Sequence, residues 1–169
     1  MATKTLGADA VYAALDKLNI AYQLHHHEPL FTVEESQKLR GEISGGHCKN
    51  LFLKSKKGKL CLLVVLEDKK VDLKRFEKIV AQGRLSFGKA ELLMEILGVI
   101  PGAVTPFAVI NDHEKQVDVY LDKDMLDYDI LNYHPLDNRA TCSIAASDLI
   151  PFLNAMHKNP EVISIPVIE

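Results

Sequence analysis

The sequence predicts an α+β fold with a mixed sheet, and three observations support this class. Apolar residues recur at helical spacing in some segments and form short continuous or alternating runs in others. The two kinds of segment follow one another without the regular βαβ rhythm of a parallel α/β sheet. The chain has 169 residues, 47% of them hydrophobic and 25% charged, which is ordinary for one domain with a sizeable core. We therefore expect a single domain over residues 1–169.

The first half of the chain predicts a helix, an extended segment, a short helix and a hairpin. Residues 8–18 carry apolar side chains at helical spacing, which indicates an amphipathic helix. The segment 20–29 is expected to be extended and to end at its proline. Thr32–Glu35 reads TVEE, a capping box that starts a short helix. Within 51–66, two apolar runs flank a Lys-Gly turn, as in a β-hairpin.

The second half predicts three more helices and several strands. The helices are expected over residues 72–80, 88–98 and 147–158, the second stopped by Gly98 and the third carrying Pro151 in its first turn. A second hairpin is expected over 106–122, with Asn111-Asp112 opening its turn. The remaining strands are expected over 129–135, 140–146 and 161–169, the last at an edge of the sheet.

The charge of the chain is unevenly distributed. The net charge of −3 argues against a general nucleic-acid-binding protein. However, residues 38–89 carry 14 Lys and Arg against 5 Asp and Glu, whereas the rest of the chain carries 6 against 18. Such asymmetry is typical of a surface that meets a polyanion, and equally of solvated helix and hairpin faces, so both interpretations stay open.

The sequence predicts neither export nor membrane insertion. Its first residues lack the apolar core of a signal peptide, and no segment approaches the roughly 18 apolar residues of a membrane span. The three cysteines, Cys48, Cys61 and Cys142, form no CxxC pair and are expected to be free, mostly buried thiols. We expect a cytoplasmic protein with no membrane partner.

The common signatures of catalysis are absent from the sequence. It has no GxSxG, no phosphate-binding or dinucleotide-binding glycine motif, and no HExxH. The run His25–His27 suggests a metal site, but adjacent residues of an extended segment point to opposite faces and cannot all reach one ion. Cys48 beside Lys49 suggests an activated thiol, but neighbours on a strand face apart, so small packing is the better interpretation. We expect no metal and no cofactor.

Three polar or glycine-rich features stand at the ends of predicted elements. Lys49 and Asn50 precede an apolar strand, although lysine is rarely buried without a partner. The segment Gly98–Gly102, GVIPG, permits close approach to a ligand, but it also fits a helix C-cap followed by a turn. His134 stands before a proline at a strand exit, where a structural role is the commoner one. Each feature alone is a weak signal.

Together, four segments resemble the family of prolyl-tRNA editing domains, the freestanding relatives of the editing insertion in bacterial prolyl-tRNA synthetase. In chain order they read HEPLFTVEES, GGHCKNLFLKSKKGK, LSFGKAELLMEILGVIPGAVTPFAVIND and NYHPLDNRATCSI. The likeness runs from about residue 6 to residue 166. It implies the fold of the YbaK and prolyl-tRNA synthetase-associated domains, a partly barrel-like mixed sheet surrounded by helices.

Within this family, the chain resembles the alanyl-tRNA(Pro) deacylase branch, because the cysteinyl-tRNA(Pro) deacylases usually carry Lys-Thr where this chain has Lys49-Asn50. The resemblance implies that Lys49 is the essential catalytic residue, that Asn50 helps hold the aminoacyl group and that His134 limits the size of its side chain. The loop 98–102 would approach the substrate, and Thr32 would border the terminal adenosine. The implied substrate-binding residues are Asn50, Thr32, Gly98, Pro101, Gly102 and His134.

The implied reaction is hydrolysis of the ester that joins alanine to the terminal adenosine. This ester is already activated, so positioning and charge stabilisation can suffice without a Ser-His-Asp set. A lysine base would have to be neutral near pH 7, which costs roughly 4 kcal/mol, so we expect Lys49 to act as a cation. Lys49 and Asn50 would then line a pocket wall at the strand end. The alternative is that Lys49 extends to solvent and Asn50 satisfies a turn.

The expected partner is the acceptor end of tRNA(Pro), with the basic segment 54–89 as the candidate contact and prolyl-tRNA synthetase as a second candidate partner. Binding alone discriminates a one-methylene difference by only about 10–200-fold, so a second site too small for proline can clear the synthetase's errors. Two alternatives stay open. One is a deacylase for another small amino acid, cysteine or serine, and the other is a non-catalytic, synthetase-associated tRNA-binding module.

Overall fold

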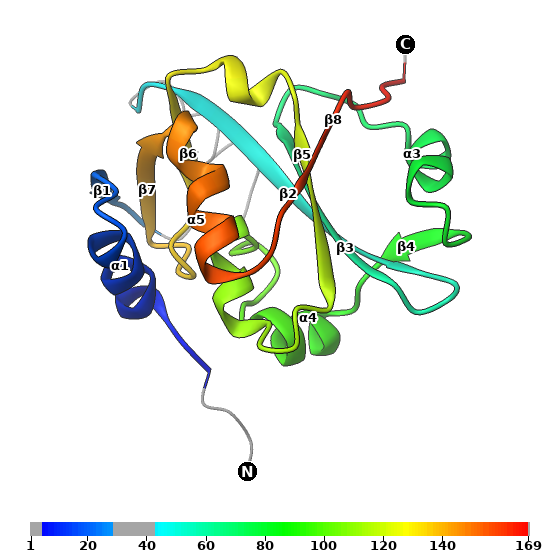
Figure 1. Cartoon of the computed structure of the whole chain (residues 1–169), viewed down its shortest axis with the longest axis horizontal. Coiled ribbons are helices and arrows are strands. Elements are labelled where there is room, and N and C mark those ends of the chain that lie inside the picture. The colour runs from blue at the N-terminus through cyan, green and yellow to red at the C-terminus, as the bar shows by residue number, and fades with distance from the viewer. Residues whose placement is uncertain (1–4, 29–42, 169) are drawn as a thin grey trace.

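The computed structural model describes residues 5–28 and 43–168 (Figure 1). The described residues form an eight-stranded mixed sheet with helices on both of its faces, so the predicted fold class is confirmed. Thr32 and the short helix expected to begin there lie outside the described residues. Within the described ranges, no helix is long and apolar enough to cross a membrane.

The sheet follows the order β1-β7-β6-β2-β3-β5-β8, and β4 pairs with β2 beside this path. Three of its pairs are parallel, β2 with β6, β3 with β5 and β5 with β8, and the others are antiparallel. The strands are β1 (Tyr22–His26), β2 (Gly46–Ser55), β3 (Leu60–Leu66), β4 (Leu85–Phe87), β5 (Val117–Asp122), β6 (Ile130–Tyr133), β7 (Ala140–Ala145) and β8 (Glu161–Ile163).

The helices follow local signals that the sequence carries. The side chain of Asp72 accepts a hydrogen bond from the Arg75 N–H at 3.2 Å and begins α3, while Gly98 ends α4 in the left-handed conformation. The α-helices are α1 (Ala8–Lys17), α3 (Leu73–Val80), α4 (Ala90–Leu97) and α5 (Leu149–Met156). The 3-10 helices are η1 (Pro106–Asn111), η2 (Met125–Asp127) and η3 (Ala146–Asp148).

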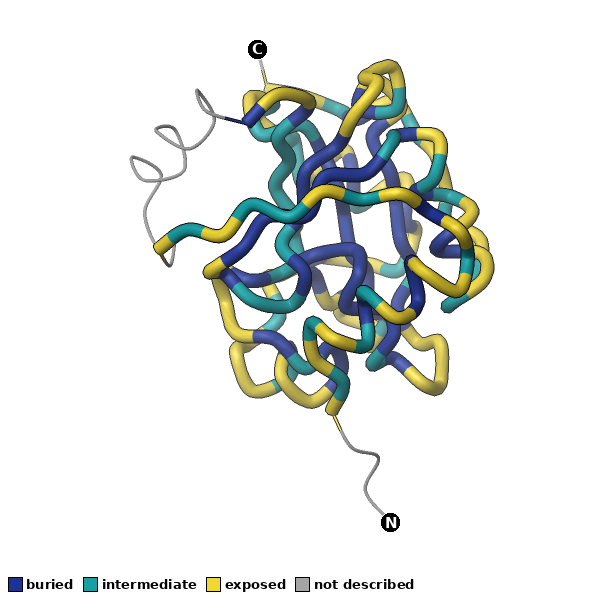
Figure 2. The backbone as a smooth tube through the Cα atoms, turned by 90° about the vertical axis from the view of Figure 1, so that its left-hand side faces the viewer, coloured by how far each residue is buried: buried dark blue, intermediate teal, exposed yellow. Residues whose placement is uncertain are grey.

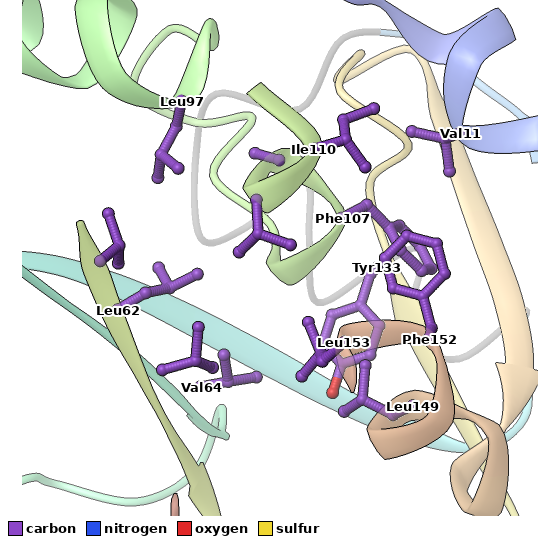
Figure 3. Close-up of a cluster of buried hydrophobic side chains, with 14 of the residues drawn as sticks. Val11, Leu62, Val64, Leu97, Phe107, Ile110, Tyr133, Leu149, Phe152 and Leu153 are labelled. Carbon is purple, nitrogen blue, oxygen red and sulfur yellow. The ribbon is translucent and has the colours of Figure 1, made fainter. Parts of the chain in front are cut away.

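The larger core lies between one face of the sheet and α1, α4, η1 and α5. Phe107 of η1 stands at its centre, with its ring centroid 5.9 Å from that of Tyr133 and 5.2 Å from that of Phe152 (Figure 3). Both contacts are edge-to-face, the arrangement that aromatic quadrupoles favour. Strands and helices far apart in the sequence therefore meet around one aromatic side chain.

A smaller core lies on the opposite face, where α3 covers β2, β3 and β5 (Figure 1). Phe76 of α3 packs edge-to-face on Tyr120 of β5 at 5.2 Å. Alternate residues of β3 belong to the two cores, so this strand is buried on both faces. This explains its continuous apolar run. Figure 2 shows buried, dark blue segments running through the interior of the fold, with exposed, yellow segments toward the outside.

The hairpin expected over 106–122 is wrong in its first half, since residues 106–111 form η1 and only Val117–Asp122 is a strand. Thr105 begins the helix by accepting from the Phe107 N–H at 3.3 Å. The residues from Pro106 to Ile110 are all buried, and a continuous apolar run does not distinguish a buried helical turn from a buried strand. The three-residue β4 was not expected, because so short a strand shows too few alternations to be recognised.

Candidate active site

Among the residues that the structure describes, β2 has a continuous strand neighbour on one edge only. On that edge β3 pairs with it from Cys48 to Lys54, and the Glu67 N–H donates to the His47 carbonyl. On the other edge β6 pairs with Gly46 and His47, and β4 pairs with residues 53–55. On the same edge the Phe52 carbonyl accepts from the Gly88 N–H, just beyond β4, at 2.9 Å. Between these contacts, residues 48–51 have no strand neighbour on this edge within the part of the chain that the structure describes. We call residues 48–51 the unpaired edge of β2.

Lys49 and Asn50 both stand at the unpaired edge, but on opposite faces of the strand. Lys49 shares its face with Leu51 and Leu53, and its ammonium donates a hydrogen bond to the Lys69 carbonyl oxygen. Asn50 faces the larger core, and its Nδ2 donates to the Val104 carbonyl oxygen at 3.0 Å. The two side chains therefore flank the strand instead of projecting from one face of it.

The amide of Asn50 is only half satisfied. Its Oδ1 is buried and has no hydrogen-bond partner among the described residues. A buried acceptor left unpaired costs about 1–3 kcal/mol, so native proteins rarely retain one without a use. With Nδ2 fixed on Val104, this buried oxygen keeps an unused capacity to accept a hydrogen bond.

The thiol beside Lys49 is a packing residue, as the sequence predicted. Cys48 lies on the face opposite Lys49, and its Sγ is 3.7 Å from the Tyr133 hydroxyl. Burial raises the pKa of Cys48 to about 12, so its thiol stays protonated near neutral pH. The other cysteines, Cys61 and Cys142, are buried and free. None of these features supports a nucleophilic cysteine.

His134 follows the last residue of β6. The β2–β6 ladder ends at His47↔Asn132, two residues before Lys49 on one strand and before His134 on the other. Its Nδ1 lies 2.9 Å from the Ala140 carbonyl oxygen, which can only accept, so Nδ1 carries the hydrogen and Nε2 is left as an acceptor in the neutral ring. Burial lowers the pKa of His134, which outweighs that hydrogen bond and keeps the ring neutral at pH 7.

The run His25–His27 belongs to strand β1 and its exit. His25 and His26 alternate along β1, as expected for neighbours on a strand. His27 has both ring nitrogens engaged, with Nε2 2.9 Å from the Thr141 hydroxyl and Nδ1 2.8 Å from the Glu28 carbonyl oxygen. Its ring centroid is 6.2 Å from that of His134, so the last histidine of the run borders the candidate site.

The loop 98–102 is connected to the site through Val104, which lies two residues after the loop. Gly98 (φ 67°) is the C-cap of α4, and its N–H donates to the carbonyls at the end of that helix. A Cβ at Gly98 would lie 2.6 Å from Thr5 and 2.7 Å from Asn111, so packing as well as backbone geometry requires glycine there. Pro101 and Gly102 are exposed, and Val104 makes the contact with Asn50.

Three polar residues of the site were not singled out from the sequence. Asn132 donates to the Ser44 and Gly46 carbonyls at 3.0 and 3.1 Å and accepts from Ser143, which fixes the chain where it enters β2. Lys69 and the fully buried Asp122 pair at 2.8 Å beside the carbonyl that receives Lys49. Their signal in the sequence is a polar residue inside or just after an apolar strand.

Part of the basic segment lines a shallow hollow of about 450 Å³ beside β2 and β4. Its cations are Lys54, Lys56 and Arg84, all exposed. Lys54 lies four residues beyond Asn50 on the same face of β2, roughly 13 Å along the strand. Other lysines of the segment are already paired, as Lys59 is with Asp118 at 2.9 Å. The uneven charge thus includes both a cationic hollow and structural ion pairs.

Comparison with known proteins gives consistent matches. The family model of the aminoacyl-tRNA editing domain matches residues 27–152. The prolyl-tRNA editing protein ProX of Acetoanaerobium sticklandii is 39% identical over 147 residues, covering 86% of this chain and 90% of that protein. The prolyl-tRNA synthetase associated domain-containing protein 1 of Danio rerio is 34% identical over 152 residues, covering 89% and 83%. A solved structure described as a candidate trans-editing enzyme for prolyl-tRNA synthetase is similar in fold, with a TM-score of 0.74 at 22% identity over 97% and 99% of the two chains.

Replacing Gly98 by alanine is expected to destabilise the protein more than the same change at Gly58. Both glycines have positive φ, so alanine costs about 1–2 kcal/mol of backbone strain at each. A Cβ meets nothing within 4 Å at Gly58, whereas at Gly98 it meets Thr5 and Asn111. Thermal unfolding should show a larger fall in Tm for Gly98→Ala. Equal falls would contradict the close packing around Gly98.

The neutral state of His134 predicts a pH dependence of stability. Because folding lowers its pKa below the unfolded value of about 6.5, its contribution is complete above that pH and is lost as the pH falls. The Tm of the wild-type protein should therefore fall more between pH 7.5 and pH 5 than that of His134→Gln. The exposed His113→Gln is the matched control. The same pH dependence in all three proteins would show that His134 is not held neutral.

Proposed function

The chain belongs to the aminoacyl-tRNA editing domain family, and from this membership we propose that it is a freestanding deacylase that hydrolyses mischarged alanyl-tRNA(Pro). The observation that carries the proposal is the pair Lys49 and Asn50 on either side of the unpaired edge of β2. The Lys49 ammonium and the unpaired Asn50 amide oxygen lie at this edge. The neighbouring side chains of β2 pack into the two cores.

In the proposed reaction a water oxygen attacks the ester carbonyl carbon, and the ester C–O bond then breaks. The proton lost by the water passes to the departing ribose oxygen with the help of the vicinal ribose hydroxyl. The products are alanine and tRNA with a free terminal adenosine. Lys49 acts as a cation that stabilises the negative charge developing on the carbonyl oxygen. No proton has to leave the lysine in this role.

Asn50 and His134 are proposed to recognise the aminoacyl group. A free acceptor such as Asn50 Oδ1 fits the α-ammonium of an amino acid, which distinguishes an aminoacyl ester from other esters. The neutral His134 adds bulk to the site without adding a charge. We propose that this bulk excludes proline and admits alanine, so that the site acts as the second sieve behind the synthetase. Cysteine and serine are the competing substrates of similar size.

The acceptor stem is proposed to follow β2 toward the hollow lined by Lys54 and Arg84. About 13 Å separates Asn50 from Lys54 along the strand, which suits a terminal adenosine at the site and phosphates at the hollow. This contact would allow the protein to distinguish tRNA(Pro) from tRNA that correctly carries alanine. Prolyl-tRNA synthetase is the second proposed partner, since an editing enzyme acts on what that synthetase releases.

Purified protein is expected to deacylate alanyl-tRNA(Pro) faster than cysteinyl- or seryl-tRNA(Pro), and to leave prolyl-tRNA(Pro) intact. Lys49→Ala should abolish the activity, because the charge on the oxyanion is then unmatched, and Lys49→Arg should keep at most part of it. Lys115→Ala, at an exposed lysine outside the basic segment, is the control. Full activity of Lys49→Ala would refute the role of Lys49. Hydrolysis of none of the four substrates would favour the non-catalytic tRNA-binding module.

Binding to a non-hydrolysable, amide-linked alanyl-tRNA(Pro) should weaken steeply as salt rises, because phosphate contacts release counterions. Lys54→Ala and Arg84→Ala should each weaken binding and lower the slope of log affinity against log salt by about one. Lys115→Ala should leave both quantities unchanged. A slope that neither variant alters would exclude the hollow as a phosphate contact.

A further inference from the structure

The carbonyl that receives the Lys49 ammonium belongs to a turn that is fastened to the end of β5. This turn follows β3 and contains Lys69. The carboxylate of Asp122, at the last position of β5, is fully buried. Its Oδ2 accepts from the Leu66 N–H at 3.1 Å, and its Oδ1 accepts from the Lys69 ammonium at 2.8 Å. One buried side chain thus holds the turn at its start and at Lys69.

Lys69 is held from a second direction as well. Its ammonium lies 2.7 Å from the exposed carboxylate of Asp124, whose own N–H donates to Asp122 Oδ1 at 3.0 Å. The two carboxylates and the lysine therefore form one closed set of charge-assisted hydrogen bonds. Such bonds are shorter and stronger than neutral ones. The backbone of the turn is fixed separately, because the Lys69 N–H donates to the Leu66 carbonyl at 3.1 Å.

A fixed carbonyl matters because the side chain of a lysine has four rotatable bonds. The backbone of β2 alone does not set where the Lys49 ammonium stands. Its hydrogen bond to the Lys69 carbonyl selects one position, and that position is only as well defined as the turn that carries the carbonyl. A displacement of about 1 Å between reacting groups can cost on the order of 10²-fold in rate.

We infer that Asp122 and Lys69 are positioning residues that act through Lys49, an inference that rests on the proposed deacylase function. Asp122 fixes the turn, Lys69 presents its carbonyl, and the carbonyl sets the Lys49 ammonium beside the unpaired edge of β2. Asp122 is fully buried, so it can act on the substrate only through the residues that it holds. Their removal should therefore slow the chemical step and leave substrate binding nearly unchanged.

The test compares Asp122→Asn with Asp118→Asn on the same strand. Asp118 also joins two lysines, Lys59 at 2.9 Å and Lys158 at 2.6 Å, but its ion pairs have no link to Lys49. For Asp122→Asn, kcat on alanyl-tRNA(Pro) should fall by about tenfold or more while KM stays within about twofold. Asp118→Asn should keep the wild-type kcat. Thermal unfolding shows that each variant is folded at the assay temperature.

A second readout follows Lys49 without relying on activity. The rate of Lys49 acetylation by acetic anhydride, measured by peptide mass spectrometry against the exposed Lys115, should rise several-fold in Asp122→Asn and stay unchanged in Asp118→Asn. If Asp122→Asn does not fold, Lys69→Met replaces it, since methionine keeps the backbone carbonyl and removes the cation that Asp122 and Asp124 hold.

The two readouts separate failure of the inference from failure of the proposed function. A folded variant that keeps the wild-type kcat, or the wild-type acetylation of Lys49, overturns the inference. A loss of kcat together with faster acetylation supports it. Should the wild-type protein hydrolyse none of the aminoacyl-tRNAs, the proposed function fails, and the acetylation rate by itself decides whether Asp122 fixes the Lys49 ammonium.

Discussion

Along one edge, β2 pairs first with β6 and later with β4, and between them the backbone from Cys48 to Leu51 has no strand neighbour among the described residues. A strand that changes its neighbour exposes a short length of edge inside an otherwise continuous sheet. Side chains at that point need not complete a core, so they can be polar. Lys49 and Asn50 occupy this position, and every other feature of the candidate site is arranged around it.

The two faces of β2 serve the site in different ways. On the face of Asn50, the large core fixes the loop that ends in Val104, and this loop orients the amide. On the face of Lys49, the ion pair between Asp122 and Lys69 lies beside the smaller apolar core. The polar atoms of the site are thus held by a loop and a turn that are themselves fixed to the two cores and to the buried Asp122, which favours a preorganised arrangement.

Much of the fold could be predicted from the sequence, because its signals are local. Gly98 marks the end of α4, and Asp72 marks the start of α3. Two apolar runs on either side of a turn predict the hairpin of β2 and β3. The prediction failed where a local pattern has two solutions: residues 106–110 are apolar throughout, and only burial on all sides makes them a helical turn rather than a strand. The short β4 carried too little pattern to be recognised, since it exists through its pairing with β2.

For the site, the sequence by itself determined which residue types are available and that Lys49 and Asn50 stand where apolar residues would be expected. Strand alternation also fixed in advance that Cys48 and Lys49 face apart. The tertiary structure decided that Lys49 and Asn50 flank an unpaired edge, that Val104 holds one and Lys69 the other, and that Asp122 stands behind Lys69. These contacts join residues 20 to 54 positions apart, and no local pattern encodes which distant carbonyl a side chain will find.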